Sequence, residues 1–153
     1  MVCYRKILLT TDFSECSKAA IPHAVALARK SDAELVVLHV LEPLLTPLDV
    51  TWGPVAQLED WEAQRADYSR KYLDEWAHSE LPSDLTVNTL LIHGTPIRGI
   101  LRTVSDLDID LVVMATHGQT GIAHALFGST SEKVVSRCPV PVLTVRVMED
   151  NAG

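Results

Sequence analysis

One segment of the sequence combines residue types that can hold a phosphate group. Gly118, Gly121 and Gly128 are three of only seven glycines in the chain, and they gather in one segment that ends at a predicted helix. Glycines let backbone N–H groups approach an anion closely, and a helix N-terminus presents unpaired donors. Ser129 and Thr130 would add hydroxyl donors to the same site. The segment therefore predicts an anion-binding turn.

The same residues also permit a purely structural interpretation. Ser129 and Glu132 have the spacing of a capping box, in which the serine and glutamate side chains only satisfy the helix end. The segment is not a Walker motif, because the nearest lysine, Lys133, falls inside the predicted helix. Spacing alone therefore leaves anion binding and helix capping as two open alternatives.

A second polar segment, Thr11-Asp12, follows the first apolar run of the chain. In open α/β sheets, ligands bind beyond the carboxyl ends of the strands, where the strand order reverses. Residues 115–118 follow the fourth apolar run, so the two segments are expected to meet at such a point. His117 would then lie beside a bound anion, either as a donor or only to fix the loop. Asp12 has an alternative role as the cap of the first helix.

Short apolar runs alternate with amphipathic stretches along the chain. Strands are predicted at residues 6–10, 34–40, 86–92, 110–115 and 140–147. Helices are predicted at residues 21–28, 58–76, 97–104 and 129–137, with residues 43–55 as a loop. Strict alternation of this kind predicts an α/β fold with a parallel sheet, right-handed crossovers and helices on both faces. The longest helix is predicted from an aromatic stripe with Arg65 on it; its members are Leu58, Trp61, Tyr68, Tyr72 and Trp76. The three tryptophans of the chain, Trp52, Trp61 and Trp76, are expected to cover the sheet.

Composition bounds the class of protein. The chain has 153 residues, 47% of them hydrophobic and 22% charged, which fits one domain over residues 1–148 with a tail at 149–153. The net charge of −7 argues against a nucleic-acid binder, and no apolar run is long enough to span a membrane. Cys3, Cys16 and Cys138 are widely scattered. The cysteine pattern predicts neither a disulfide framework nor a metal site, and a reducing cytoplasm is the expected location.

Two stretches carry a resemblance to a known family. ILLTTDFSECSKAAIPHAVALA at the front and ATHGQTGIAHALFGSTSEKVVSRCPVPVLTV near the end resemble the universal stress protein family. The resemblance implies a Rossmann-like five-stranded parallel sheet, similar to that of the adenine nucleotide alpha hydrolases, with strand order 3-2-1-4-5. It also implies binding of ATP or AMP through a G-x2-G-x9-G-[ST] signature. Gly118, Gly128 and Ser129 match that signature, whereas Ala115 stands where the nucleotide binders have glycine. The added methyl group either crowds the nucleotide or is harmless if φ is negative there.

The resemblance also implies a role for each remaining site residue. Asp12 with Thr11 would meet the ribose hydroxyls. Val40 would offer backbone groups to the adenine edge, and Met114 would pack near the ring. The phosphates would be held by Gly118, Gly128, Ser129 and Thr130. Without the resemblance, Val40 and Met114 are simply core residues.

The last predicted strand raises the question of assembly. In the order 3-2-1-4-5 it lies at a sheet edge, and such an apolar edge favours association. In the family this strand pairs with its twin, so the resemblance implies a homodimer through the strand from Val140 to Val147.

The sequence therefore predicts a homodimeric, adenine-nucleotide-binding protein of stress response or signalling, with Mg²⁺ as an optional companion of ATP. The alternatives are slow ATP hydrolysis, autophosphorylation on Ser129, Thr130 or Ser131, ATP-dependent activation of a substrate, and a nucleotide-free interaction protein.

Overall fold

A computed structural model describes residues 1–43, 55–117 and 128–147 of the chain. Its five strands form one parallel sheet in the order β3-β2-β1-β4-β5, which confirms the predicted fold and strand order. The strands are β1 (Lys6–Thr10), β2 (Glu34–Leu41), β3 (Val87–His93), β4 (Leu111–Ala115) and β5 (Val142–Val145). The strand order reverses between β1 and β4, and a binding site is expected at that point.

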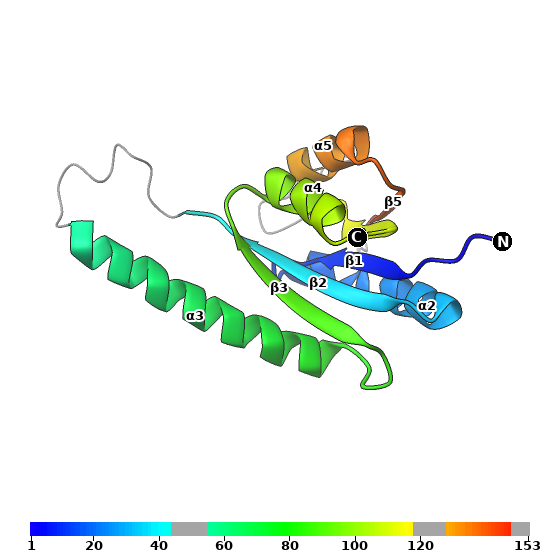
Figure 1. Cartoon of the computed structure of the whole chain (residues 1–153), viewed down its shortest axis with the longest axis horizontal. Helices are drawn as coiled ribbons and strands as arrows, with labels where there is room; N and C mark the ends of the chain where they lie inside the picture. The colour runs from blue at the N-terminus through cyan, green and yellow to red at the C-terminus, as the bar shows by residue number, and fades with distance from the viewer. Residues whose placement is uncertain (44–54, 118–127, 148–153) are drawn as a thin grey trace, which may run out of the picture.

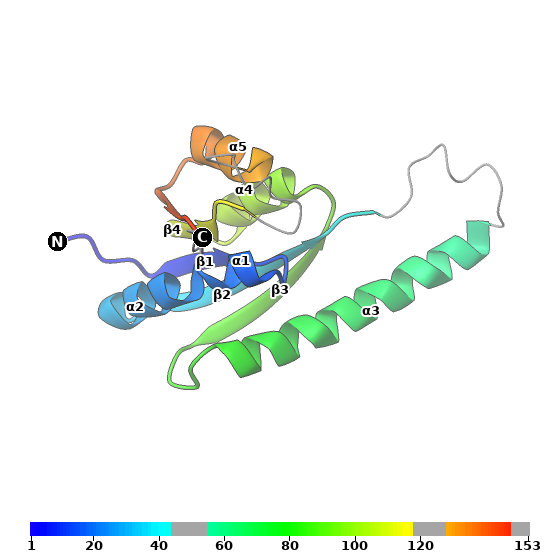
Figure 2. The ribbon, with the colours of Figure 1, turned by 180° about the vertical axis from the view of Figure 1, so that it is seen from behind.

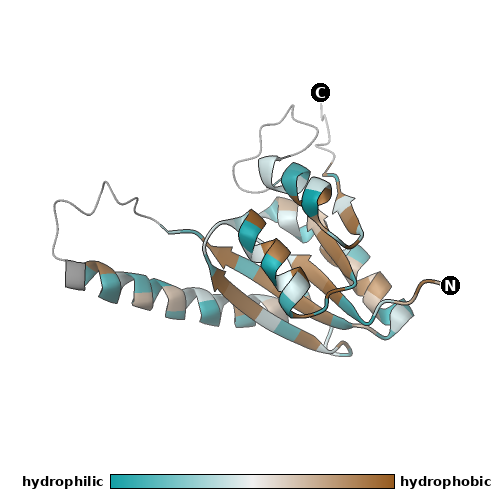
Figure 3. Cartoon of the chain, turned by 45° about the horizontal axis from the view of Figure 1, so that its top comes forward, coloured by the Kyte–Doolittle hydropathy of each residue, from teal (hydrophilic) through white to brown (hydrophobic). Residues whose placement is uncertain are grey.

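The helices cover the two faces of this sheet (Figures 1 and 2). On one face lie α1 (Glu15–Lys18), α2 (Ile21–Ser31) and α3 (Val55–Glu80), whereas α4 (Pro96–Asp106) and α5 (Ser129–Arg137) lie on the other. Each face has its own buried apolar cluster, the first centred on residues such as Leu9 and Val37 and the second on Leu8 and Val112. Neighbouring strand residues enter opposite clusters because side chains alternate along a strand. The central strands are accordingly mostly apolar (Figure 3).

The expected helices form with small differences in extent. Pro22 lies in the first turn of α2, where a missing N–H removes no helical hydrogen bond. Thr95 is the N-cap of α4 by backbone conformation, although its side chain makes no capping bond. The helix predicted at 58–76 runs longer, from Val55 to Glu80. Of the predicted loop at 43–55, residues 44–54 lie outside the described part, as does the tail at 149–153.

The last strand is shorter than predicted. β5 covers Val142–Val145 instead of the stretch from Val140 to Val147. Pro141 has no N–H, and Val145 pairs with Ala115, the final residue of β4, so the ladder has no partner beyond that point. The carbonyl groups of Pro141 and Val145 accept hydrogen bonds from the N–H groups of Val112 in β4 and of Thr116 just after it. By alternation, the N–H groups of Val142 and Thr144 point to the open edge of the sheet.

The aromatic stripe of α3 covers the sheet only in part. Trp76 is 5% exposed and Leu73 is buried, but Trp61 is 65% exposed and Tyr68 is 71% exposed. The N-terminal half of α3 extends past the ends of the strands (Figure 1), so its apolar face has no sheet beneath it. The prediction that the tryptophans cover the sheet is therefore wrong for Trp61 and confirmed for Trp76, and Trp52 lies outside the described residues.

Two close contacts fix parts of this framework. Asp110 Oδ2 accepts hydrogen bonds from the backbone N–H groups of Arg5 (2.7 Å) and Lys6 (2.9 Å), which ties the start of β1 to β4. Gly99 of α4 lies directly on Val40 of β2: a Cβ atom there would lie 2.7 Å from Val40 Cγ2. No helix within the described ranges is long and apolar enough to cross a membrane.

Candidate functional site

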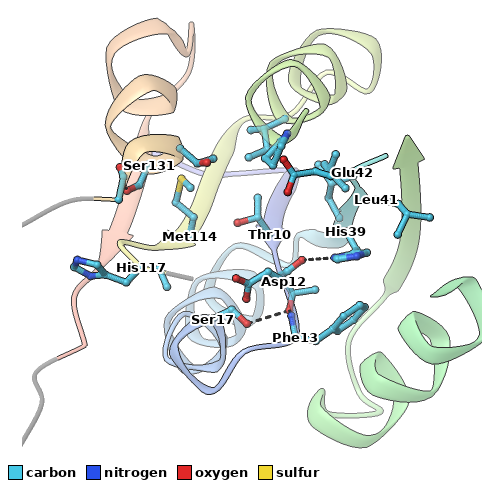
Figure 4. A pocket seen from close by; sticks show the side chains of 18 of the residues that line it. Thr10, Asp12, Phe13, Ser17, His39, Leu41, Glu42, Met114, His117 and Ser131 are labelled. Carbon is cyan, nitrogen blue, oxygen red and sulfur yellow. Dashed lines mark hydrogen bonds between the residues drawn. The ribbon is translucent and has the colours of Figure 1, made fainter. Parts of the chain in front are cut away.

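A cavity of about 1020 Å³ lies at the carboxyl ends of β1, β2 and β4 (Figure 4). This is the point where the strand order reverses, as expected. Nine of the ten predicted site residues line it; the tenth, Gly118, lies outside the described residues. The nine are Thr11, Asp12, Val40, Met114, Ala115, His117, Gly128, Ser129 and Thr130.

The turn after β1 places Asp12 near the centre of the cavity (Figure 4). Its Oδ1 atom accepts hydrogen bonds from the N–H (3.0 Å) and the hydroxyl (2.5 Å) of Ser14. Ser14 in turn caps α1, because its Oγ accepts the N–H of Ser17 at 3.1 Å. The alternative role of Asp12 as the cap of the first helix is therefore wrong: Ser14 holds that position, and Asp12 holds the turn before it.

Phe13 turns the chain in a conformation that bulky residues rarely adopt. Its φ is +64°, in the left-handed region, which costs about 1–2 kcal/mol for a residue with a Cβ atom. Its N–H donates to Thr11 Oγ1 at 3.0 Å. Its ring packs on His39 at 4.3 Å and edge-on to Tyr72 at 4.8 Å. These contacts offset the strain and direct the backbone so that Asp12 remains in the cavity.

His39 anchors this turn to the end of β2. Its Nδ1 atom lies 2.8 Å from the carbonyl oxygen of Thr11. Burial lowers the pKa of His39, while the hydrogen bond to Thr11 and the carboxylate of Asp12 oppose that shift. The ring is therefore neutral near pH 7. Nδ1 carries the hydrogen, because a carbonyl oxygen can only accept, and Nε2 is left as an acceptor.

The other end of the cavity is formed by the first turn of α5. Gly128 is its N-cap, and the Gly128 N–H donates to the Thr116 carbonyl at 2.7 Å. The Ser131 hydroxyl is shared between the carbonyls of Thr116 (2.9 Å) and Gly128 (3.0 Å). A Cβ atom on Gly128 would lie 2.8 Å from the Thr116 oxygen, so only glycine fits there without a shift.

This arrangement corrects the capping-box alternative. Ser129 is the first helical residue and not the cap, and no side chain caps α5. The Ser131 hydroxyl instead fastens the helix to the end of β4. The backbone N–H groups at the start of α5 have no partner within the helix, and they open to the cavity beside the Ser129 and Thr130 hydroxyls. His117 contacts the Thr116 hydroxyl through Nδ1 at 3.0 Å.

Val40 and Met114 form an apolar wall on the α4 side. Both belong to or pack on the buried cluster of that face, and both line the cavity, so they serve the core and the site together. Ala115 also lines the cavity, and its φ is negative, because the non-glycine residues with positive φ are Phe13, Asp32 and Asp108 in the described part. A methyl group at 115 therefore causes no backbone strain.

Sequence reasoning missed a group of lining residues on the α3 side: Phe13, His39, Arg65, Tyr68 and Tyr72. Strand alternation gave a signal for His39, because the β2 residues two positions before and after it belong to the buried cluster on the α3 face of the sheet. Nothing in the sequence indicated the left-handed turn at Phe13. Among the described residues, no group of three or more His, Cys, Asp or Glu side chains could hold a metal ion.

The fold defines a Rossmann-like α/β protein with a cavity at its switch point. The profile described as "Universal stress protein family" matches residues 3–146. The chain belongs to this family.

Individual relatives agree with that assignment. A universal stress protein of Thermus aquaticus is 34% identical over 94% of this chain and 99% of its own length. The universal stress protein MJ0531 of Methanocaldococcus jannaschii is 31% identical over 94% of this chain and 82% of its own. The solved structure of MJ0577 superposes with a TM-score of 0.81 at 25% identity, covering 96% and 99% of the two chains.

Two more distant structures share the fold and hold ligands. A universal stress protein in complex with cAMP has a TM-score of 0.60 at 22% identity, covering 94% of this chain and 98% of its own. An Arabidopsis thaliana family member with AMP bound has a TM-score of 0.58 at 15% identity, covering 97% and 95%.

Proposed function

We propose that this protein binds an adenine nucleotide, ATP or AMP, in the cavity at the strand reversal, and acts as a homodimer in stress response or signalling. The observation that carries the proposal is one continuous cavity that joins three kinds of group. These are a carboxylate on a fixed turn, an apolar wall beside a strand end, and the open first turn of a helix.

The first turn of α5 would bind the phosphates. Its unpaired N–H groups and the hydroxyls of Ser129 and Thr130 are neutral donors that favour an anion without a lysine. Gly128 supports this role because its N–H and the Ser131 hydroxyl are both engaged with Thr116, which fixes the direction of the helix. An anion can therefore bind to this acidic protein through local donors.

Asp12 would accept hydrogen bonds from the ribose hydroxyls. A carboxylate suits a vicinal diol because it offers several lone pairs and no hydrogens. Its bonds from Ser14 fix its position before a ligand arrives, so less entropy is lost on binding. Val40 and Met114 would contact the adenine ring. The AMP and cAMP complexes of the more distant family members support the choice of adenine.

We place the dimer contact on β5, since this strand is the sheet edge beside β4 and directs two N–H groups outward. We also propose a reducing cytoplasm as the location, where the three cysteines would remain thiols.

The site favours holding a nucleotide over cleaving one. Ser131 is 2% exposed, and its hydroxyl donates to two carbonyl groups. Of the three residues considered for autophosphorylation, Ser129 and Thr130 are therefore better placed to accept a phosphoryl group.

The test is direct. Purified protein is denatured and the supernatant chromatographed for ATP, ADP and AMP; the stripped and refolded protein is then titrated by calorimetry with each nucleotide, with and without Mg²⁺. We expect saturable binding at one site per chain. The absence of bound nucleotide together with no binding at millimolar ATP would favour the nucleotide-free interaction protein, and rapid turnover would favour the enzyme alternatives.

A further inference from the structure

The cavity extends beyond Asp12 onto the face of the sheet covered by α3. We call this part the α3 lobe and define it by five lining residues: Phe13, His39, Arg65, Tyr68 and Tyr72. None of them takes part in the proposed contacts to phosphate, ribose or adenine.

Strand geometry separates the α3 lobe from the adenine wall. His39 and Val40 are consecutive residues of β2, so their side chains point to opposite faces of the sheet. Val40 packs in the cluster under α4, whereas the His39 ring packs on Phe13, which belongs to the cluster under α3. An adenine ring beside Val40 therefore leaves the α3 lobe open.

The α3 lobe contains groups that stack on planar rings. Arg65, Tyr68 and Tyr72 follow a spacing of three and four residues, so they share one face of α3. Tyr68 and Tyr72 lie nearly parallel, with an interplanar angle of 14° and centroids 6.3 Å apart. Tyr68 is 71% exposed and Tyr72 is 42% exposed, so part of each phenol remains uncovered.

The charged residues that line the cavity limit the class of ligand that the α3 lobe can bind. Arg65 is the only lysine or arginine that lines the cavity in the described part of the chain, and its guanidinium contacts Glu62 at 3.4 Å. The carboxylates of Asp12 and Glu42 also line the cavity. A second free anion would meet these carboxylates. A planar ring would instead stack on tyrosine and guanidinium faces, which a carboxylate at the edge of the guanidinium does not block.

We infer that the α3 lobe binds a second planar ring carried by the same adenine nucleotide. This inference rests on the proposed function, because the nucleotide at Asp12 supplies the point from which the ring reaches the lobe. The ring is attached either at the ribose oxygens next to Asp12 or at the far end of a polyphosphate, as in a dinucleoside polyphosphate. His39 Nε2 offers an acceptor to an amino group on such a ring.

The experiment compares matched ligands with and without the second ring. ADP is compared with ADP carrying one N-methylanthraniloyl ring on a single ribose oxygen, which leaves the other hydroxyl to Asp12. Adenosine tetraphosphate is compared with diadenosine tetraphosphate. We expect at least one ring-bearing ligand to bind about tenfold more tightly than its partner, as one stacked ring contributes in other proteins. The ligand pair in which the ring raises the affinity identifies where on the nucleotide the ring is attached.

Variants of α3 locate the ring. Tyr68→Ala is expected to abolish the gain while leaving the affinity for plain ADP unchanged. Trp61→Ala is the matched control, because Trp61 is an equally exposed aromatic residue of the same helix that does not line the cavity. It should preserve the gain, and exposure makes both variants compatible with folding.

Equal affinities within both ligand pairs would overturn the inference, and so would a gain that survives Tyr68→Ala. If ADP and adenosine tetraphosphate bind but the second ring does not raise the affinity, this inference fails and the proposed function stands. If neither plain nucleotide binds, the proposed function fails and the inference with it.

Discussion

The Nδ1 atom of His39 donates a hydrogen bond to the carbonyl oxygen of Thr11 over 2.8 Å and thereby joins the end of β2 to the turn that carries Asp12. The two residues are 28 positions apart in the sequence; His39 lies in β2, and Thr11 directly follows the neighbouring strand β1. The bond needs a hydrogen only on Nδ1, so the neutral ring is sufficient for it.

Stability should depend on pH through His39. Burial lowers the pKa of His39 below its ordinary value of 6.5, so the unfolded chain takes up the proton first. Stability from the neutral ring is fully present above pH 6.5 and is lost as the pH falls from there through the lower pKa of the folded state. Urea titrations between pH 7.5 and pH 5 should show a steeper loss for the wild type than for His39→Asn, which keeps a donor but cannot titrate. His23→Asn, on an exposed position of α2, should behave like the wild type. Identical slopes for wild type and His39→Asn would contradict this account.

Asp12→Asn should weaken ATP binding about tenfold, which corresponds to roughly 1.4 kcal/mol. The amide oxygen still accepts the Ser14 N–H, so the turn should persist, but the charged acceptor for ribose is gone. Calorimetry with 2′-deoxy-ATP is the control. If Asp12 contacts the 2′-hydroxyl, the substitution should have a smaller effect on the deoxy nucleotide than on ATP. Equal losses for both nucleotides would assign Asp12 to another contact.

Gly128→Ala should weaken nucleotide binding by at least about tenfold and lower stability by roughly 1–3 kcal/mol, as overpacking does elsewhere. The new Cβ atom would lie 2.8 Å from the Thr116 carbonyl, so the first turn of α5 must shift. Ser129→Ala removes only a hydroxyl and should cost less affinity. The oligomeric state should not change in either variant. Unchanged ATP affinity in Gly128→Ala would mean that the phosphates bind elsewhere.

Asp110→Asn should destabilise the protein by about 1–3 kcal/mol, the range for a lost charge-assisted hydrogen bond, and leave nucleotide affinity unchanged. The backbone N–H groups of Lys6 and Arg5 lower the pKa of Asp110 below 3.8. Its contribution is therefore present above pH 3.8 and is lost as the pH falls through the lower pKa of the folded state. Urea unfolding at pH 7 and pH 3 should show a smaller difference between wild type and variant at the lower pH.

Thr144→Pro should convert the proposed dimer into a monomer. By alternation the Thr144 N–H points to the open edge of β5, so its removal should disturb a partner strand more than β4. Light scattering at micromolar concentration should report half the mass of the wild type. Thr144→Val keeps the N–H and should remain dimeric. A monomeric wild type would exclude the β5 dimer altogether.

The sequence predicts the fold well because its signals are local. Continuous apolar runs at residues 34–40 and 110–115 indicated strands buried on both faces, and both strands are present. The strand order came only from the family resemblance, since periodicity does not encode which strands are neighbours. The rule for strand ends directed attention to Thr11-Asp12 and residues 115–118, whereas the roles of Val40 and Met114 came only from the resemblance.

The remaining details depend on tertiary contacts. Trp61 was expected to cover the sheet, but the strands end before the helix does, so Trp61 is left exposed. The spacing of Ser129 and Glu132 matched a capping box, yet the backbone of Gly128 begins the helix because the Thr116 carbonyl accepts its N–H. Such competition between local and long-range partners has no signature in a single sequence.

The contact between Gly99 and Val40 has a mechanical consequence. Because Gly99 has no side chain, the backbone of α4 rests directly on Val40 near the end of β2, so displacing one displaces the other. α4 also packs against α5, whose first turn forms the opposite end of the cavity. A larger base that pushes Val40 outward would therefore press on the helix that supports α5. We therefore expect the base size and the phosphate-chain length of a ligand to affect its affinity together and not independently.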